Sequence, residues 1–215
     1  MSGQLFCVGL GGLIASGKSS LAAALVANDE LQEAFGGTIE HLDADALLRT
    51  ARSTDEALRE AIAAAVPRAR GADGNLNMER LAAEAFASPA VMFRLEALQW
   101  PVVRAVIRAS IRDARERGVR LVLVEAIALG RSGLAQDLDG TLFLQVDEAV
   151  RRGRFLARGG SEEEFQLRNA AQAGIPAEME RIGALPIDGG GSIVETVRAA
   201  SMALRRLCLQ GESID

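Results

Sequence analysis

The stretch GLGGLIASGKSS, residues 9–20, decides the fold of this 215-residue chain. Residues 12–19 match the pattern G-x-x-x-x-G-K-[ST], a glycine-rich loop whose backbone N–H groups cradle phosphates. The apolar run LFCVGL precedes the pattern, and the helix-forming run LAAALVAN follows it. Because the motif requires the order strand, loop and helix, we expect a phosphate-binding turn between the first strand and the first helix.

The lysine of this loop is unusual in the chain. Lysine and arginine together number 24, and Lys18 is the only lysine among them. A compact ammonium on a flexible stem reaches between the outer phosphates of a nucleotide, whereas a planar guanidinium has another shape. We therefore expect Lys18 to bridge these phosphates and the hydroxyl of Ser19 to ligate Mg²⁺.

The sequence does not support two other classes of site. Gly9 and Gly11 begin the dinucleotide-binding pattern G-x-G-x-x-G, but Ile14 occupies its last position. A Ser-His-Asp hydrolase would have to be built on His41, the single histidine, which lies near the expected end of a strand. Neither a dinucleotide site nor a hydrolase triad is predicted.

The composition is typical of a globular protein with one folding unit. Hydrophobic residues make up 49% and charged residues 25%, and no apolar run approaches the roughly 20 residues of a membrane span. The start MSGQLFCVGL lacks the basic residues of a signal peptide, so we expect a cytoplasmic protein. The net charge of -5 argues against a nucleic-acid partner. Cys7 and Cys208 lack metal-ligand spacing and are expected to be buried, inert thiols.

The apolar pattern alternates between strands and helices. Strands are expected at residues 5–10, 38–42, 119–126, 141–146 and 184–187, and helices at 17–27 and 192–209. About seventy residues after the second strand have only helical periodicity, with breaks expected at Pro67, Pro89 and Pro101. Capping boxes are expected at Ser53 with Glu56, Ser161 with Glu164 and Ser192 with Glu195.

This order predicts a three-layer α/β fold. A parallel sheet of about five strands would be flanked by helices, and an all-helical lobe would be inserted after the second strand. We expect the core to comprise residues 1–45 and 118–215, and the insertion to comprise about 46–117.

Three acids follow expected strands. Glu125 is the first acid after the buried run LVLV, where it would reach Mg²⁺ through water, orient the acceptor, or simply face solvent. Asp43 and Asp45 occupy alternate positions after the second strand, so as an extended segment both would project the same way. One of them would accept the proton of an attacking hydroxyl, and one would serve equally well as a helix N-cap.

Arginines gather after the fourth expected strand. Arg154 and Arg158 are four residues apart and would share a helix face. Such arginines close over a nucleotide and neutralise charge on a moving phosphoryl group, although an arginine-rich face is often merely solvated.

In these motifs the chain resembles the dephospho-CoA kinase family. The members of this family are P-loop kinases that phosphorylate the ribose 3′-hydroxyl of dephospho-CoA. The stretches similar to family motifs are VGLGGLIASGKSSLAAAL, LDADALLR, GADGNLNMERLAAEAFASPA, VLVEAIALGRSGL, RGRFLARGG and IDGGGS. The resemblance covers nearly the whole chain, and it rests on the order and spacing of motifs that are individually weak beyond the first loop.

The resemblance implies a P-loop NTPase-type fold, with ATP and Mg²⁺ required and dephospho-CoA as the acceptor. Asp45 would be the base for the 3′-hydroxyl, and Arg154 would belong to a lid at about residues 148–172. The helical insertion would bind the acceptor. The residues expected at ATP are Gly12, Leu13, Ile14, Ala15, Ser16, Gly17, Lys18, Ser19, Ser20, Arg154, Arg158 and Gly190. Those expected at the acceptor are Asp43, Asp45, Trp100 and Glu125.

The chain departs from the family pattern mainly on the acceptor side. Trp100 precedes Pro101 where the family commonly has His-Pro, and Glu125 begins a Glu-Ala pair in place of Asp-x-Pro. Leu13 and Ala15 stand where the family's loop usually has glycine. Two alternatives therefore stay open: a related kinase for a nucleoside, nucleotide or other small hydroxyl compound, and a nucleotide-binding relative without catalysis. The chain is expected to be a monomer or a small homo-oligomer.

Overall fold

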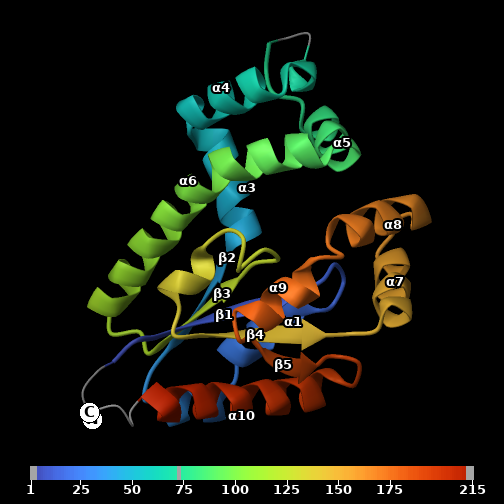
Figure 1. Cartoon of the computed structure of the whole chain (residues 1–215). Helices are drawn as coiled ribbons and strands as arrows, with labels where there is room; N and C mark the ends of the chain where they lie inside the picture. Colours follow the sequence, from blue (N-terminus) through green and yellow to red (C-terminus); the bar gives the residue numbers. More distant parts are fainter. Residues whose placement is uncertain (1–3, 72–73, 212–215) are drawn as a thin grey trace. The chain divides into compact units, whose positions relative to one another are not determined.

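The computed structural model describes residues 4–71 and 74–211, and its centre is a five-stranded sheet (Figure 1). The strands are β1 (Phe6–Gly12), β2 (Ile39–Asp43), β3 (Leu121–Glu125), β4 (Gly140–Gln145) and β5 (Leu185–Asp188). They lie in the order β2-β3-β1-β4-β5, and every neighbouring pair is parallel. The predicted parallel sheet of about five strands is confirmed.

The helices divide between two compact units. One unit comprises Met1–Asp43 and Arg108–Asp215, and the other comprises Ala44–Ile107. The first unit holds the sheet with α1 (Lys18–Val26), α2 (Asp29–Phe35), η2 (Leu134–Asp137), α7 (Glu148–Ala157), α8 (Glu162–Ala171), α9 (Ile175–Arg181) and α10 (Ile193–Gly211). The second holds α3 (Ala44–Thr54), α4 (Glu56–Ala65), η1 (Pro67–Ala69), α5 (Met78–Ala87) and most of α6 (Pro89–Glu116). We call them the sheet unit and the helical unit.

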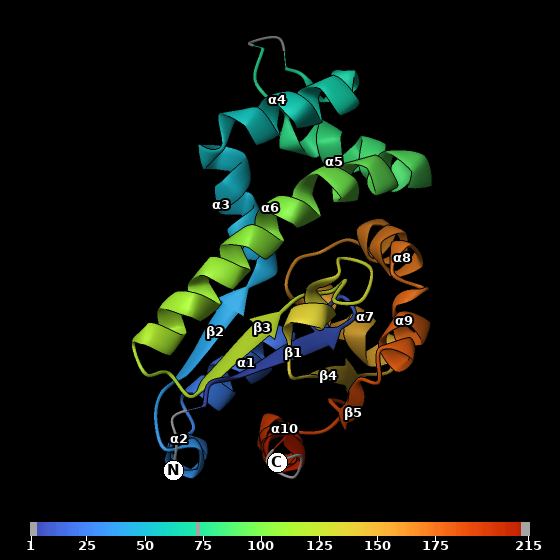
Figure 2. The same ribbon diagram turned by 60° about the vertical axis from the view of Figure 1, so that its left-hand side comes forward.

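The core of the sheet unit explains why its strands read as continuous apolar runs. All five residues of β3 are buried, because β3 is an inner strand of a parallel sheet. Helices α1 and α10 contact each other, and they pack against β2 and β5 respectively (Figures 1 and 2). The buried cluster between them includes Leu10, Leu21, Leu123 and Leu204. This packing fixes the carboxyl ends of β1, β2 and β3 along one edge of the sheet.

The thiol of Cys7 in β1 is buried and free, as predicted. Burial, together with the nearby charge of Asp139, raises its pKa to about 11, although Arg115 opposes the shift. The side chain of Cys208 lies outside the residues whose side chains the structure describes.

We expect Cys7 to be unreactive in the folded protein. Thiolate is the reactive form, and a pKa of about 11 leaves at least about 100-fold less thiolate at pH 8 than an ordinary thiol. In a Cys208→Ser variant, iodoacetamide at pH 8 should label Cys7 slowly in buffer and rapidly in denaturant. Equal labelling rates in the two conditions would contradict this placement.

The helical unit has its own apolar core, which includes Leu58, Ile62, Leu81 and Leu95. Two local predictions for this segment are wrong. Helix α4 is capped by Asp55, whose carboxylate accepts the Leu58 amide at 2.9 Å, and not by the expected Ser53–Glu56 box. The Ser53 hydroxyl instead donates to the Thr50 carbonyl at 2.8 Å, because α3 continues to Thr54.

Pro101 does not end a helix, contrary to the prediction. Helix α6 runs through it from Pro89 to Glu116. Proline removes one backbone hydrogen bond from a helix interior, which costs about 3 kcal/mol. Burial of Leu95, Val103, Ile107 and Ile111 along α6 stabilises the helix against that loss. No helix among the described residues is long and apolar enough to cross a membrane.

Candidate active site

The glycine loop lies at the carboxyl end of β1 and runs directly into α1, as its pattern predicts. Gly17 is the residue before α1 and has φ 99°, a left-handed conformation that glycine adopts at little cost. At Gly12, a Cβ atom would lie 2.6 Å from Ser16 Oγ and 3.2 Å from the backbone carbonyl oxygen of Leu144. The two glycines of the motif therefore permit a turn that is tight both in torsion and in space.

Ala15 adopts a left-handed conformation with φ 57°, and it is the only described non-glycine residue with a positive φ. This conformation costs an L-residue roughly 1–2 kcal/mol, which explains why glycine is usual there in similar loops. Ala15 is therefore a strained residue in the centre of the glycine loop, and contacts of the loop with the rest of the protein must stabilise its left-handed conformation.

We expect Ala15→Gly to leave the protein as stable as the wild type or slightly more stable. The relief of strain exceeds or offsets the roughly 0.4–1 kcal/mol of chain entropy that glycine adds to the unfolded state. Ala23→Gly is the matched control, because Ala23 is exposed within α1. Glycine in a helix interior should lower the free energy of unfolding by about 1 kcal/mol. Chemical denaturation measures both. A destabilisation at Ala15 equal to that at Ala23 would contradict the strained conformation.

Lys18 begins α1 and is held close to the loop. Its side chain is buried, and Nζ lies 3.3 Å from the Leu13 carbonyl oxygen, to which it donates. The loop amides are partly engaged: the Ser16 amide donates to the Leu13 carbonyl at 3.1 Å, and the Ile14 amide donates to Gln172 Oε1 at 2.7 Å. One amide of the loop, that of Ile14, therefore already donates to a side-chain oxygen.

Glu125 is the centre of a buried polar contact at the sheet edge. Its Oε1 accepts the Ser19 hydroxyl at 2.7 Å, and its Oε2 lies 3.0 Å from His41 Nε2. Burial raises the pKa of Glu125, but the hydrogen bonds from His41 and Ser19 and the charge of Lys18 outweigh burial and hold the pKa below its usual range. The carboxylate is therefore ionised at neutral pH, immediately beside the hydroxyl of the loop.

The two aspartates after β2 do not share one extended segment. Asp43 is the last residue of β2 and pairs in register with Glu125 of β3, so these two acids are neighbours on adjacent strands. Asp45 lies in the first turn of α3, which begins at Ala44 without an intervening loop. The predicted alternation beyond Asp43 is wrong, because the helix period replaces the strand period there.

The residues expected to form a lid lie mostly in two helices of the sheet unit, α7 and α8. Arg154 donates from Nη1 to the Ser16 carbonyl and from Nη2 to the Gly189 carbonyl, each at 2.9 Å. It therefore connects the phosphate loop to the segment after β5, which also contains Gly190. Arg158 is exposed and follows the end of α7, and no hydrogen bond of its side chain is found among the described residues.

Three residues at this site were not predicted: His41, Gln172 and Arg151. Arg151 is buried, and it donates to the Val146 carbonyl at 3.1 Å and to Asn169 Oδ1 at 2.9 Å. The sequence offered a signal for two of them. His41 is the single histidine and lies near a strand end, and Arg151 is the first of the four arginines at positions 151, 152, 154 and 158. Gln172 carried no signal, because its contact with Ile14 spans 158 residues.

Trp100 lies in α6 of the helical unit, and its indole nitrogen is buried without a hydrogen-bond acceptor. The adjacent Gln99 accepts a hydrogen bond from Arg52 Nη2 at 2.5 Å, and its amide nitrogen is also buried without a partner. Buried donors of this kind are uncommon in native proteins. The helical unit therefore places two unsatisfied donors side by side in the chain, on Gln99 and Trp100.

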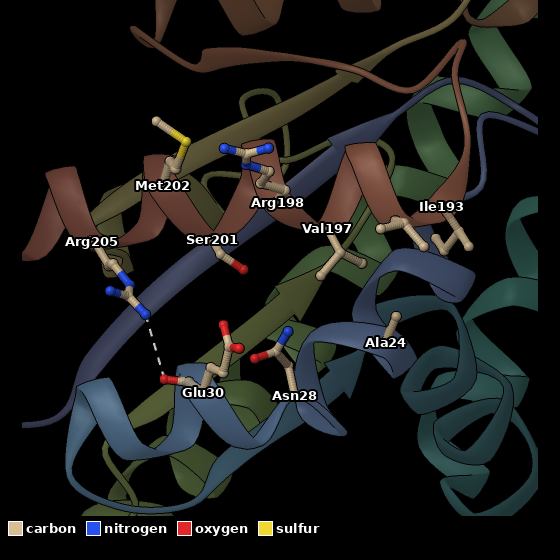
Figure 3. Close-up of a pocket in the computed structure, with 10 residues that line it drawn as sticks. Ala24, Asn28, Glu30, Ile193, Val197, Arg198, Ser201, Met202 and Arg205 are labelled. Atoms are coloured by element: carbon tan, nitrogen blue, oxygen red, sulfur yellow. Dashed lines mark hydrogen bonds between the residues drawn. The ribbon is translucent and has the colours of Figure 1, made fainter.

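A groove of about 690 Å³ lies elsewhere, between α10 and the α1–α2 segment (Figure 3). Val197, Ser201 and Arg205 project from α10 toward Asn28 and Glu30. None of the residues that line the groove belongs to the glycine loop or to the acids of the sheet edge. We therefore place neither the nucleotide nor the acceptor there.

Comparisons with known proteins identify the family to which the chain belongs. The family model described as dephospho-CoA kinase matches residues 6–187. A dephospho-CoA kinase of Symbiobacterium thermophilum is 32% identical over 94% of this chain and 81% of the relative. That of Deinococcus radiodurans is 32% identical over 93% of this chain and 91% of the relative. A crystal structure from Thermus thermophilus has 31% identity and a TM-score of 0.72, covering 94% and 97% of the two chains. This chain belongs to the dephospho-CoA kinase family and is a phosphotransferase of the kinase type.

Proposed function

We propose that this protein transfers the terminal phosphoryl group of ATP to the ribose 3′-hydroxyl of dephospho-CoA, giving coenzyme A and ADP. The observation that carries the proposal is the contact of the phosphate-loop residue Ser19 with the edge carboxylate Glu125, beside Lys18 and Arg154. The family membership of the chain supports the choice of acceptor.

The donor side of the reaction is assigned to the glycine loop and the lid. Loop amides and Lys18 would bind the β- and γ-phosphates, since a helix N-terminus and a nest of amides favour anions. Arg154 Nη1 donates to the Ser16 carbonyl at 2.9 Å, so its guanidinium lies beside the loop that would hold the phosphates. There it would neutralise charge that develops on the transferred group.

The residues present also fit Mg²⁺. Among the described residues no three His, Cys, Asp or Glu side chains are grouped to hold a metal ion by themselves. Mg²⁺ usually keeps several waters and takes one or two protein oxygens together with substrate phosphates. Ser19 would supply an oxygen directly and Glu125 would act through water. When bound, Mg²⁺ neutralises phosphate charge and orients the β- and γ-phosphates.

The acceptor side is assigned to the helical unit and the end of β2. Asp45 is exposed in the first turn of α3 and would accept the proton of the 3′-hydroxyl. Asp43 would assist beside Glu125, and Trp100 would contact the acceptor. Positioning and charge neutralisation carry most of the rate in this type of reaction, so little covalent work is required of the protein.

We infer that the partners are the small molecules ATP and dephospho-CoA, with no nucleic acid. The net charge of -5 supports this, because a nucleic-acid surface repels an acidic protein. We propose that the protein works in the cytoplasm as a monomer or a small homo-oligomer. Light scattering coupled to size-exclusion chromatography measures the oligomeric state, and a large assembly would contradict the proposal.

A coupled assay that follows ADP production tests the proposed reaction. We expect turnover with ATP, Mg²⁺ and dephospho-CoA well above that of Lys18→Ala, and formation of coenzyme A as the product. Nucleosides, nucleotides and small alcohols form the comparison panel of acceptors. Turnover only with one of these compounds would overturn the choice of acceptor, and ATP binding without turnover on any acceptor would overturn catalysis.

A further inference from the structure

The contact between Ser19 of the glycine loop and Glu125 at the sheet edge extends to a third residue, His41. Ser19 Oγ, the two carboxylate oxygens of Glu125, and His41 Nε2 form a chain with separations of 2.7 and 3.0 Å. The Glu125 side chain is 8% exposed and that of His41 is 24% exposed, so both are largely shielded from water. Ser19, at the other end of the chain, is exposed.

The sheet register explains how His41 reaches Glu125. In the pairing of β2 with β3, Asp43 lies opposite Glu125 and His41 lies opposite Leu123. Residues two apart on a strand face the same side, so His41 shares a face with Asp43 and with Glu125. The two carboxylate oxygens of Glu125 therefore contact two different groups, Oε1 the loop hydroxyl and Oε2 the imidazole of His41.

The positions of the hydrogen atoms follow from the chemistry of these groups. An ionised carboxylate only accepts hydrogen bonds, so Ser19 must donate its single proton to Glu125. For the same reason, His41 must carry a proton on Nε2. The lone pairs of Ser19 Oγ are then left for a cation on its exposed side. If the carboxylate were to rotate away, the hydroxyl proton would be free to point toward that cation.

We propose that His41 is a positioning residue, which holds the Glu125 carboxylate so that the Ser19 hydroxyl presents its oxygen to the metal of a bound nucleotide. His41 acts through Glu125 and touches neither metal nor nucleotide. This inference rests on the proposed binding of Mg²⁺ with the nucleotide at the loop. Groups that orient metal ligands in this way typically contribute about 10–100-fold to metal affinity.

Calorimetric titration with ADP, in excess Mg²⁺ and in EDTA, tests the proposal without turnover. For His41→Leu we expect the Kd of Mg·ADP to rise about tenfold, while the Kd of metal-free ADP stays within about twofold. The metal-free titration also reports whether the loop is folded. A purely structural role for His41 would move both values together.

Two amide variants provide a matched pair. His41→Gln places a donor nitrogen about where Nε2 lies, whereas the side chain of His41→Asn is too short to reach Oε2. We expect His41→Gln to retain near wild-type affinity for Mg·ADP and His41→Asn to lose as much as His41→Leu. In a Ser19→Ala background, His41→Leu should have less than about a twofold effect, because the two residues act through one chain of contacts.

Each of several results would overturn the proposal: unchanged Mg·ADP affinity in His41→Leu and His41→Asn, an equal loss for metal-free ADP, or a full additional loss in the Ser19→Ala background. If the wild type itself shows no effect of Mg²⁺ on ADP affinity, the proposed metal binding fails and the role of His41 fails with it. That outcome is distinguishable, because it is seen before any variant is made.

Discussion

Lys18→Arg is expected to lower kcat/KM by about a thousandfold, although it conserves charge. A single preorganised electrostatic contact to the reacting group is worth roughly 10²–10³ in rate. The guanidinium is wider than an ammonium and presents a planar fork, so it does not enter the turn in which Lys18 Nζ lies 3.3 Å from the Leu13 carbonyl. The nearby Glu125 carboxylate would also lose the compact charge that lowers its pKa.

The coupled assay measures this loss, and circular dichroism checks that the variant is folded. Arg112→Lys is the control in the opposite direction, because Arg112 is exposed on α6 and should tolerate the exchange without effect. Retention of more than about a tenth of wild-type activity in Lys18→Arg would show that the loop requires only a positive charge. The isolation of a single lysine among the basic residues would then be a coincidence of composition.

Asp45→Asn is expected to lower kcat by about 10²–10⁴, with little change in ATP affinity. An asparagine cannot accept the proton of the 3′-hydroxyl, and a positioned general base contributes roughly this factor. The substitution also removes an acid from the first turn of α3, where such a charge stabilises a helix by about 0.3–1 kcal/mol.

Asp43→Asn separates the two aspartates of this segment. Asp43 ends β2 in register with Glu125, so its replacement should mainly affect events at the sheet edge and cost less in kcat. Steady-state kinetics of both variants with ATP and dephospho-CoA make the comparison. An equal or larger loss for Asp43→Asn would assign the base to Asp43, and full activity of Asp45→Asn would exclude Asp45 from proton transfer.

Most of the sheet and both ends of the glycine loop were predictable from local pattern. Continuous apolar runs bounded by glycine or acidic residues predict buried parallel strands, and all five strands lie within two residues of the expected positions. Ser192 caps α10 through reciprocal contacts with Glu195, as its spacing predicts. Such features depend on neighbours within a few residues, which the sequence specifies directly.

The wrong predictions arose where packing outweighs a local rule. Pro101 is a helix breaker by itself, yet α6 continues because its apolar face is buried on both sides of the proline. Asp55 caps α4 in place of Ser53, because α3 continues through Ser53 to Thr54. In both cases burial or helix length, rather than residue type, determined the outcome.

By itself, the sequence determined a phosphate loop between a strand and a helix, a lysine suited to phosphates, and acids at the carboxyl ends of β2 and β3. Only the tertiary structure decided which groups meet. Ser19, Glu125 and His41 are separated by up to 106 residues along the chain, and they come together because β3 lies between β1 and β2. Strand order and side-chain reach are properties of the packed sheet, and no local pattern encodes them.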